Sequence, residues 1–577
     1  MLTPVSLSPA NRTQALKEMA GTELDVLVIG AGVVGAGAAL DAASRGLRVG
    51  LVEARDYASG TSSRSSKLVH GGLRYLKQLE FPLVFEALRE RALILHTLAP
   101  HLARPVPFLF PLQKSVIDRV WAGAGIGVYD VLGAGKGVPG HHRHLGRRKA
   151  LTLFPGGKKQ AIKGGILFYE GQLDDARHTL MLSRTAASFG AQCANSTRVM
   201  GFLRDGDRVA GAQVCDLETG DLIDIRARHV VNAAGVWTDE IQAMLGNRGQ
   251  LKVHASKGVH IVVPRDRIDA ATGLITETEK SLLFIIPCPW SDDFWVIGTT
   301  DTTWNLDLAH PAATSRDIEY ILGQVNALLA KPLTRDDIVG VFAGLRPLLA
   351  GEADDSSTLS REHAVVSPAP GLTLVAGGKY TTYRVMAKDA IDAALRDVGG
   401  TFEPSRTETT PLVGAREYEE MWSARARLAA TSGLTVGRLE HLLHRYGSAV
   451  TEVLELIAGA PQLAAPLPGG ERYLKAEIVY AVTHEGALHL DDILARRTRV
   501  SIETRDRGKV AALAAAELVK PYLGWDTAAV QREIEHYHAR VDAEIDSQLQ
   551  ADDHTADAAR LGAPDVRAGA RAGAKVL

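Results

Sequence analysis

The chain has 577 residues, of which 46% are hydrophobic and 23% charged, a composition typical of soluble globular proteins. Its length exceeds a single ordinary core, so two or three domains are expected. A formal net charge of -2 leaves no overall basic field of the kind that holds nucleic acid, and no nucleic-acid partner is expected. Cys193, Cys215 and Cys288 lack the spacing of metal or redox motifs, which fits a reducing cytoplasm and predicts no metal site.

The first 50 residues predict a βαβ start. Residues 1–22 form a polar lead without the apolar centre of an export signal. DVLVIG (25–30) is a β-branched run that ends in glycine, as a buried parallel strand does. AGAALDAASRG (36–46) predicts a helix that ends at glycine, and LRVGLVE (47–53) predicts a second strand. The apolar run 26–40 is glycine-rich and too short to span a bilayer, so any membrane contact is expected to be peripheral.

The middle of the chain alternates helical and strand patterns. FEALRERALILHTLAPHL (85–102) and ARHTLMLSRTAASFGA (176–191) predict helices, and the glycine- and base-rich region 133–163 predicts loops. A strand pair is expected around 198–231. Several further strands within 251–349 (HIVV, LLFIIP and FWVIGTT) indicate a mixed sheet that roofs a site.

The last third changes character. GLTLVAGGKYTTYRVMAKDAI (371–391) predicts a strand, a glycine turn and a helix, and helical patterns dominate from about residue 405. The last 30 or so residues are rich in Ala, Asp, Arg and Gly, with almost no large apolar groups. They predict a disordered tail.

A glycine motif at the first strand–helix junction predicts dinucleotide binding. Gly30, Gly32 and Gly35 follow the pattern G-x-G-x-x-G, which allows a tight turn and a close approach of backbone to a pyrophosphate. Glu53 ends the second strand, about 20 residues on, where a carboxylate accepts from ribose hydroxyls. A glycine-rich packing turn, the plain alternative, leaves Glu53 unexplained.

Two later segments favour FAD over NAD. VVNAAGVW (230–237) and VAGGKYTTYR (375–384) are both strands that run into glycine turns. Glycines there let backbone amides approach a flavin or its phosphates. A nicotinamide-binding domain near the N-terminus does not need segments from so far along the chain to return to its cofactor.

Several longer motifs carry a specific resemblance. The segments 25–53, TSSRSSKLVHGGLRYL (61–76), IGTTD (297–301), GLRPL (344–348) and GGKYTTYR (377–384) occur in the order found in the FAD-dependent glycerol-3-phosphate dehydrogenases. HLDDILARRTRVSIETRDRG (489–508) is similar to a segment of that family's helical cap domain. The resemblance spans roughly residues 24–545. This chain departs from the family in having Arg64 where small residues are usual, and Tyr380 after the GGK sequence.

The resemblance implies an α/β fold like that of glycine and D-amino acid oxidases, with a Rossmann-like FAD-binding domain, a β-rich substrate domain and a C-terminal helical cap domain. The expected boundaries are 1–22 for an N-terminal lead and 23–95, 160–250 and 350–400 for a discontinuous FAD-binding domain. The substrate domain is expected at 96–159 and 251–349, the cap at 401–545 and a disordered tail at 546–577.

The family also implies a reaction, the oxidation of sn-glycerol 3-phosphate to dihydroxyacetone phosphate by hydride transfer to FAD. The phosphate dianion calls for cations, and the forked guanidinium of arginine binds phosphate oxygens bidentately. By match to the motifs, Arg74, Arg346 and Lys379 are expected on the phosphate side, with hydroxyl hydrogen bonds from Tyr75 and Thr299. The residues expected to contact the cofactor, besides Gly30, Gly32, Gly35, Glu53 and Lys379, are Thr61, Ser65, Ser66, Lys67, Gly71, Gly72, Val199, Ala234, Gly235, Trp237, Gly378 and Thr381.

Each cation has a plain alternative. Arg74 also fits an exposed helix arginine, and Lys379, after two glycines, also fits a surface turn. Arg346 lies between Leu345 and Pro347, where an unpaired charge is costly, which favours a buried partner such as a phosphate.

The proton acceptor is expected to be a histidine, and a lysine or arginine near the flavin with an altered pKa is the alternative. His70 is the first choice, because imidazole titrates near working pH and can take the alcohol proton. His260 is the second, although a lone histidine in a strand is more often a core residue. With Arg346 and Lys379, these two complete the expected catalytic group.

The electron acceptor stays open between two kinds of partner. The resemblance implies a membrane quinone, so the protein is expected in the cytoplasm, at the inner face of the membrane. The basic segment 136–163 fits binding to anionic headgroups, or simply a solvated loop. An oxygen-dependent oxidase and a flavin-binding protein without catalysis are the alternatives, and a homodimer is left open.

Overall fold

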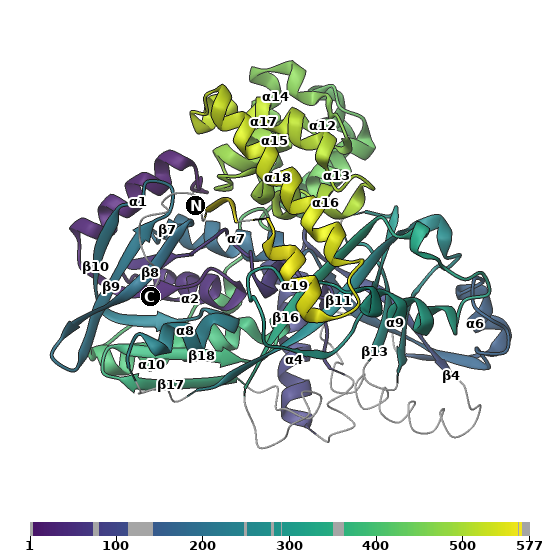
Figure 1. Cartoon of the computed structure of the whole chain (residues 1–577), viewed down its shortest axis with the longest axis horizontal. Helices are drawn as coiled ribbons and strands as arrows, with labels where there is room; N and C mark the ends of the chain where they lie inside the picture. Colours follow the sequence, from purple (N-terminus) through teal and green to yellow (C-terminus); the bar gives the residue numbers. More distant parts are fainter. Residues whose placement is uncertain are drawn as a thin grey trace.

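The structure is a computed structural model that describes residues 4–72, 80–112, 142–246, 251–278, 282–289, 291–349, 363–563 and 565–567. Two sheets lie side by side, and a helical cap packs above them in the view of Figure 1. This arrangement is the architecture that the sequence predicts.

The first sheet has a parallel core in the order β18, β10, β1, β2, β7, with β17 antiparallel to β18 at one edge. The hairpin β8–β9 continues from β10, and among described residues the sheet has eight strands. Their bounds are β1 Leu24–Ile29, β2 Val49–Val52, β7 Gln192–Ala194, β8 Thr197–Asp205, β9 Arg208–Asp216, β10 Leu222–Asn232, β17 His363–Ala369 and β18 Leu372–Gly377.

Both faces of this sheet are covered, which explains the apolar run from Val26 to Ile29 in β1. Val26 and Val28 pack in a cluster with α2 (Val33–Ser44), α7 (Asp175–Ser188) and α10 (Tyr383–Val398). Leu27 and Ile29 point the other way, because successive side chains of a strand alternate between faces.

Residues 1–22, expected to be a polar lead, contain helix α1 (Pro9–Gly21). Ser8 caps it by accepting from the amide of Asn11 at 3.2 Å. Leu16 and Met19 pack in the same cluster as Leu27, and α1 contacts β7 and β10. The lead is therefore part of the first domain's core, and the buried ion pair of Arg12 with Asp216 holds it there as well.

The second sheet has ten strands among described residues, with β15, β11, β14, β13, β12, β4, β6 and β3 in order and with β16 on β11 and β5 on β6. The three expected strand segments within 251–349 are confirmed, as parts of β11, β13 and β14. The bounds are β3 Leu68–Val69, β4 Ala103–Leu112, β5 Arg143–Gly146, β6 Gly164–Leu173, β11 Val253–Pro264, β12 Gly273–Glu277, β13 Leu282–Pro287, β14 Phe294–Gly298, β15 Thr302–Trp304 and β16 Gly340–Leu349.

Two strands lie in a different sheet from the one expected. β3 and β6 fall within ranges assigned to the FAD-binding domain, yet β6 pairs with β4 along ten residues and β3 pairs with β6. Pairing with a distant strand decides sheet membership, and the sequence pattern of β6 does not specify its partner. The loop expected at 133–163 also contains β5 and α6 (Arg147–Leu153) in its described part.

Helices cover and connect the sheets. α9 (Ser315–Asn326) packs on β11 and β13, and α8 (Thr238–Ala243) follows β10. α4 (Phe81–Leu93) extends away from the body at the bottom of Figure 1 and ends in a π-turn, η2 (Ile94–Leu98). No helix in the described part of the chain is both long enough and apolar enough to cross a membrane.

The cap is helical, as expected. Its core joins α15 and α17 through Ile478, Val482, Ala512 and Ala515. The helices are α11 Tyr418–Ser423, α12 Arg425–Ser432, α13 Val436–Tyr446, α14 Val450–Gly459, α15 Lys475–Thr483, α16 Val500–Glu503, α17 Lys509–Leu523 and α18 Thr527–Ser547, with the π-turn η10 Asp492–Arg497 and the short ribbon β19 Pro466–Leu467 and β20 Gly470–Leu474.

The expected disordered tail is wrong for its described part. Helix α19 (Asp553–Leu561) follows α18, capped by Asp552, and Ala556 and Ala563 are buried. Farther on, Arg567 is buried against Asp492 at 2.7 Å. Composition suggested disorder because large apolar residues are scarce, but small side chains and ion pairs dock this segment instead. Residues 568–577 lie outside the described part.

Candidate functional site

The site begins at the carboxyl ends of four parallel strands. β2, β1, β10 and β18 are neighbours in the first sheet, so the residues that follow them meet at one edge. These residues are Glu53 after β2, Gly30 after β1, Ala234 and Gly235 after β10, and Gly378 after β18. Ligands of open α/β sheets bind at this edge. The two distant glycine turns therefore return to the first glycine motif, as predicted.

The glycine motif is fixed by close backbone packing. Gly30 has a φ of +95°, and a Cβ there would lie 2.8 Å from the carbonyl oxygen of Ala233. A Cβ at Gly35 would collide with the carbonyl oxygen of Gly30. Gly32 is the N-cap of α2 and provides no side-chain cap. Gly32 therefore places no side chain of its own at this helix N-terminus, where a diphosphate binds, and the amide of Val33 donates to Ser62 Oγ at 2.9 Å.

Glu53 is held in place by two backbone amides. Its carboxylate accepts from Ala31 at 2.8 Å and from Arg55 at 2.9 Å. Burial raises the pKa of Glu53, and these two amides oppose that shift. Each carboxylate oxygen has a further lone pair, so the group is oriented to accept a ribose hydroxyl.

Trp237 forms a wall beside Glu53. It ends η3 (Gly235–Trp237), and its ring faces Gly60, where a Cβ would lie 3.1 Å away. The guanidinium of Arg55 lies over the same ring, 5.3 Å from its centroid. Val199 lies nearby on β8, but its side chain packs in the apolar core of the sheet.

The segment 61–67 joins the first sheet to the second. Thr61 donates from its hydroxyl to the carbonyl oxygen of Leu345 on β16, at 2.5 Å. Arg64, the departure noted in the sequence, donates to the carbonyl of Ala309 at 3.0 Å. Burial and nearby arginines lower the pKa of Arg64 to about 10. This segment is thus tied to β16 at Thr61 and to the connection between β15 and α9 at Arg64.

Lys67 lies at the centre of a buried ion-pair group. Its Nζ donates to both carboxylate oxygens of Asp175 at 2.7 Å and to the carbonyl of Ser63 at 2.5 Å. Burial lowers the pKa of Lys67 to about 8, although Asp175 acts in the opposite direction. The same carboxylate accepts from Ser65 at 2.7 Å and from Arg499 of the cap at 3.1 Å. Lys67 therefore has a structural partner in this structure, besides its predicted contact with the cofactor.

His260 lies on β11 next to this segment. Its Nε2 is 2.9 Å from the hydroxyl of Ser66, and its ring stacks on Phe342 with centroids 4.8 Å apart. The side chain is 2% exposed, and burial, followed by the charges of Arg346 and Lys67, holds its pKa well below the ordinary value. His260 is therefore neutral at working pH and joins the 61–67 segment to the substrate sheet.

Arg346 and Thr299 form one cluster, as the motifs predict. The Nη2 of Arg346 donates to Thr299 Oγ1 and to the carbonyl of Thr300, each at 3.2 Å. Asp301 lies 3.5 Å from Nη1, and the arginine side chain remains 23% exposed. A Cβ at Gly258 would lie 2.5 Å from Nη2, so this glycine makes the room for the guanidinium.

The backbone of His70 contacts the side chain of Thr381, which follows the GGK turn. The amide of His70 donates to Thr381 Oγ1 at 3.2 Å, and that hydroxyl lies 3.3 Å from the carbonyl of His70. Gly71 and Gly72 follow. Lys379 directly follows Gly378, and its Nζ atom is buried. β16, which carries Arg346, contacts β18, and Lys379 lies two residues beyond the end of β18.

Two predicted substrate residues, Arg74 and Tyr75, lie outside the described residues. The structure adds Asp175, Gly258 and Arg499, which the sequence analysis missed. Asp175 opens α7 directly after β6, and paired aspartates at 174–175 after a strand were the available signal. Gly258 carried no signal, because its role depends on Arg346, 88 positions away.

Two family models match the chain, and together they cover most of it. One, described as "FAD dependent oxidoreductase", matches residues 25–384. The other, described as "C-terminal domain of alpha-glycerophosphate oxidase", matches residues 405–530.

The curated relatives agree with these models over nearly the whole chain. Glycerol-3-phosphate dehydrogenase 2 of Mycobacterium tuberculosis is 57% identical over 98% of this chain and 96% of its own length. The mitochondrial glycerol-3-phosphate dehydrogenase of Bos taurus is 36% identical over 92% of this chain and 75% of its own. The chain belongs to the FAD-dependent glycerol-3-phosphate dehydrogenase family.

A solved member of this family has the same fold. The glycerol-3-phosphate dehydrogenase of Bacillus halodurans, crystallised with FAD, is 30% identical, with a TM-score of 0.78 over 95% of this chain and 100% of its own. A glycerophosphate oxidase from Mycoplasma pneumoniae, 18% identical, shares the fold over 68% of this chain and 99% of its own with a TM-score of 0.53. FAD is therefore the cofactor, and the glycine motif, Glu53 and the Trp237 wall fit it.

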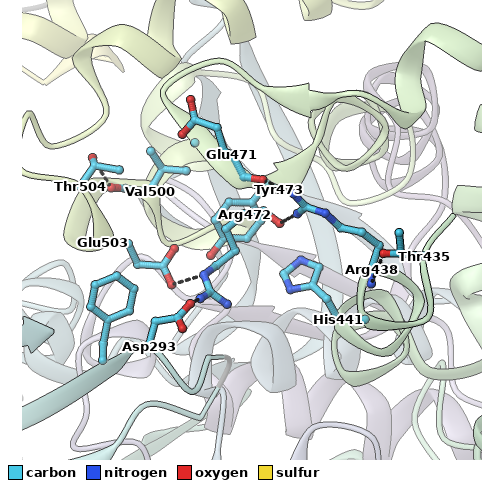
Figure 2. A pocket seen from close by; sticks show the side chains of 13 residues that line it. Asp293, Thr435, Arg438, His441, Glu471, Arg472, Tyr473, Val500, Glu503 and Thr504 are labelled. Atoms are coloured by element: carbon cyan, nitrogen blue, oxygen red, sulfur yellow. Dashed lines mark hydrogen bonds and ion pairs between the residues drawn. The ribbon is translucent and has the colours of Figure 1, made fainter. Parts of the chain in front are cut away.

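A cavity of about 600 Å³ lies elsewhere, between the cap and the second sheet. Figure 2 shows Arg472 beside Asp293 and Glu503, with Arg438 and His441 across the cavity. None of the residues predicted to bind substrate or FAD lines it. The candidate active site of this family member is therefore a different place, at the junction of the two sheets.

Proposed function

We propose that this protein oxidises sn-glycerol 3-phosphate to dihydroxyacetone phosphate, with a membrane quinone as the final electron acceptor. The observation that carries the proposal is the position of Arg346 and Thr299, a cation and a hydroxyl beside the segment 61–67 that follows the dinucleotide motif. The names of the 57% identical relatives support the same substrate.

FAD, when bound, supplies the acceptor for the hydride that leaves C2 of the substrate. The protein must therefore hold the phosphate, aim C2 at the flavin and take up the hydroxyl proton. Arg346 is suited to the phosphate, because its planar fork stays charged and its side chain is 23% exposed. Lys379 adds a second cation at the end of β18, and Arg74 a third by match to the family motif.

A histidine takes the hydroxyl proton in this proposal. We choose His260 of the two candidates. Burial and the charges of Arg346 and Lys67 keep it neutral and oppose its protonation, and pairing of Arg346 with the substrate's phosphate would relieve the effect of that charge. A neutral imidazole can accept a proton, whereas a charged one cannot. His70, the first choice from sequence, meets the site through its backbone bonds to Thr381.

The quinone requires contact with a bilayer, and two features support a peripheral contact at the inner face of the cytoplasmic membrane. Phe81 and Phe85 are 42% and 49% exposed at the start of α4, the helix that extends from the body. The basic segment 136–163, described only from residue 142, adds positive charge for anionic headgroups.

Anaerobic addition of glycerol 3-phosphate to the purified holoenzyme tests the substrate. We expect the flavin absorbance to bleach within the time of a turnover, because hydride transfer needs no second substrate. Glycerol, which lacks the phosphate, is the matched control and should bleach the flavin far more slowly. Absence of bleaching with glycerol 3-phosphate and with other phosphorylated alcohols would instead favour a flavin-binding protein without catalysis.

The acceptor is tested by comparing turnover with a quinone in anionic vesicles and turnover with oxygen. We expect quinone-dependent turnover to dominate and vesicle binding to weaken with added salt, since ionic screening weakens headgroup contacts. Equal or faster turnover with oxygen, with release of peroxide, identifies an oxidase instead.

A further inference from the structure

The C-terminal segment 550–567, here called the strap, touches all three parts of the molecule. It contains α19 and lies beyond residue 530, where the second family match ends. In Figure 1 it is the yellow helix below the cap, beside β16 and β11. Its described residues are 550–563 and 565–567.

The first part of the strap is fixed to the second sheet. The carbonyl of Gln550 accepts from the amide of Ser315 at 2.8 Å, and Asp553 pairs with Lys257 of β11. Ala556 is fully buried in a cluster with Trp304 and Leu345. This part adjoins the strand that carries Ser256 and Gly258, beside Arg346.

The second part is fixed to the cap. Arg540 of α18 donates to the carbonyl of Ala563 at 2.7 Å. Arg567, 7% exposed, pairs with Asp492 at 2.7 Å in the π-turn η10. A buried charge of this kind is costly unless it is paired, so the pairing fixes the position of the strap's end.

The same end reaches the wall of the FAD site. Asp565 lies 3.2 Å from Arg55 Nε and 3.3 Å from His310 Nε2, and Arg567 donates to Ser196 Oγ at 3.1 Å. Arg55 is the residue that lies over Trp237 and donates its amide to Glu53. Asp565 thus holds, through one ion pair, the Arg55 side chain that lies over Trp237, and the backbone amide of the same residue donates to Glu53.

We propose that the strap retains the bound FAD, with Asp565 as a positioning residue that keeps Arg55 and the Trp237 wall in place next to Glu53. FAD leaves when Trp237 and Arg55 move, and the strap connects these residues to the cap and to the second sheet. The inference rests on FAD binding alone, and it holds whatever the substrate and the electron acceptor are.

The test is the rate of FAD release from the holoenzyme, followed by the rise in flavin fluorescence after dilution. Asp565→Asn removes the charge at constant size, and we expect release to become about fivefold faster, the scale of one partly buried ion pair. Asp542→Asn is the matched control, because it breaks an exposed pair with Lys509 on the cap. Its release rate should equal that of the unaltered protein.

A second measurement separates cofactor retention from a purely structural role. If the strap closes on bound FAD, FAD must in turn stabilise the strap, because coupling is reciprocal. Hydrogen exchange in residues 553–563 should then be slower in the holoprotein than in the apoprotein, and Asp565→Asn should remove that difference. Unchanged release in Asp565→Asn, or exchange in the strap that is equal with and without FAD, overturns the proposal. Bleaching by glycerol 3-phosphate is read separately, so failure of one proposal leaves the other intact.

Discussion

Single residues in this site are defined by what surrounds them. His260 is a lone strand histidine, the kind that most often serves as a core residue. Its Nε2 bond to Ser66 and its place beside Arg346 connect it with both the cofactor-side segment and the expected phosphate side. The described residues offer no hydrogen-bond partner to its Nδ1.

We predict that His260→Ala slows anaerobic flavin reduction by glycerol 3-phosphate by at least about 100-fold, the low end for loss of a general base. Because its pKa lies well below the ordinary value, the rate in the unaltered protein should not fall between pH 8 and pH 6 through protonation of His260. Stopped-flow absorbance measures both. An unchanged flavin spectrum shows that FAD is still bound.

His70→Ala is the comparison for that experiment. We expect it to retain more of the reduction rate than His260→Ala. If His260→Ala is reduced at nearly the unaltered rate and His70→Ala more slowly, then His70, the first choice from the sequence, is the proton acceptor.

At the scale of elements, the pairing of β11 with β16 builds the anion site. Ser256 lies opposite Arg346, and Gly258 lies opposite Gly344. Gly258 leaves space for the guanidinium of Arg346, and Gly344 leaves space for the backbone of Arg64. The two glycines face each other across the β11–β16 pair. One makes room for the side chain of Arg346, and the other makes room for the segment that contains Arg64.

We predict that Gly258→Ala raises KM for glycerol 3-phosphate by about tenfold or more, because the new Cβ would lie 2.5 Å from Arg346 Nη2 and 2.8 Å from Thr299 Oγ1. Steady-state kinetics with a quinone acceptor measure this. Gly323→Ala on α9 is the control, since a Cβ there meets nothing within 4 Å. An unchanged KM in Gly258→Ala, together with an intact flavin spectrum, argues against Arg346 as the phosphate ligand.

At the scale of the whole molecule, buried ion pairs join the cap to the first domain. Arg496 and Arg497 pair with Asp56 at 2.5 and 2.7 Å, and Arg177 of α7 pairs with Glu485 at 2.6 Å. His489 lies between two carboxylates, 3.1 Å from Glu218 and 2.8 Å from Glu533. Burial and Arg567 would lower the pKa of His489, but the two carboxylates raise it to about 10.

This raised pKa gives a pH dependence of known sign. The folded protein holds a proton on His489 that the unfolded chain, with an ordinary pKa near 6.5, releases at a lower pH. The stabilisation is therefore complete below about pH 6.5 and is lost as the pH rises toward 10. We predict that the Tm of His489→Gln falls less between pH 7 and pH 9.5 than that of the unaltered protein, by about 2 to 4 °C. His536→Gln, on the same helix as Glu533, should leave the slope unchanged, and identical slopes for all three proteins would contradict the assignment.

The sequence analysis succeeded where the signal was local. Gly30, Gly32, Gly35 and Glu53 follow from short-range rules of turns and strand ends, and the returns at 230–237 and 375–384 carry the same type of signal. It went wrong for the sheet to which β6 belongs and for the described part of the tail after residue 546. Composition described the tail's side chains correctly, but it could not show that Ala556 and Arg567 find buried partners in three different regions.

The sequence by itself determined the family, the FAD cofactor and the βαβ unit that binds a dinucleotide, because these depend on motifs read within a few dozen residues. Only the tertiary structure decided that Gly258 makes room for Arg346, that Asp175 and Arg499 surround Lys67, and that Asp565 reaches Arg55. Each of these contacts joins residues far apart in the chain. Their free energy depends on burial and on the distance between charges, which exist only once the sheets and the cap have packed together.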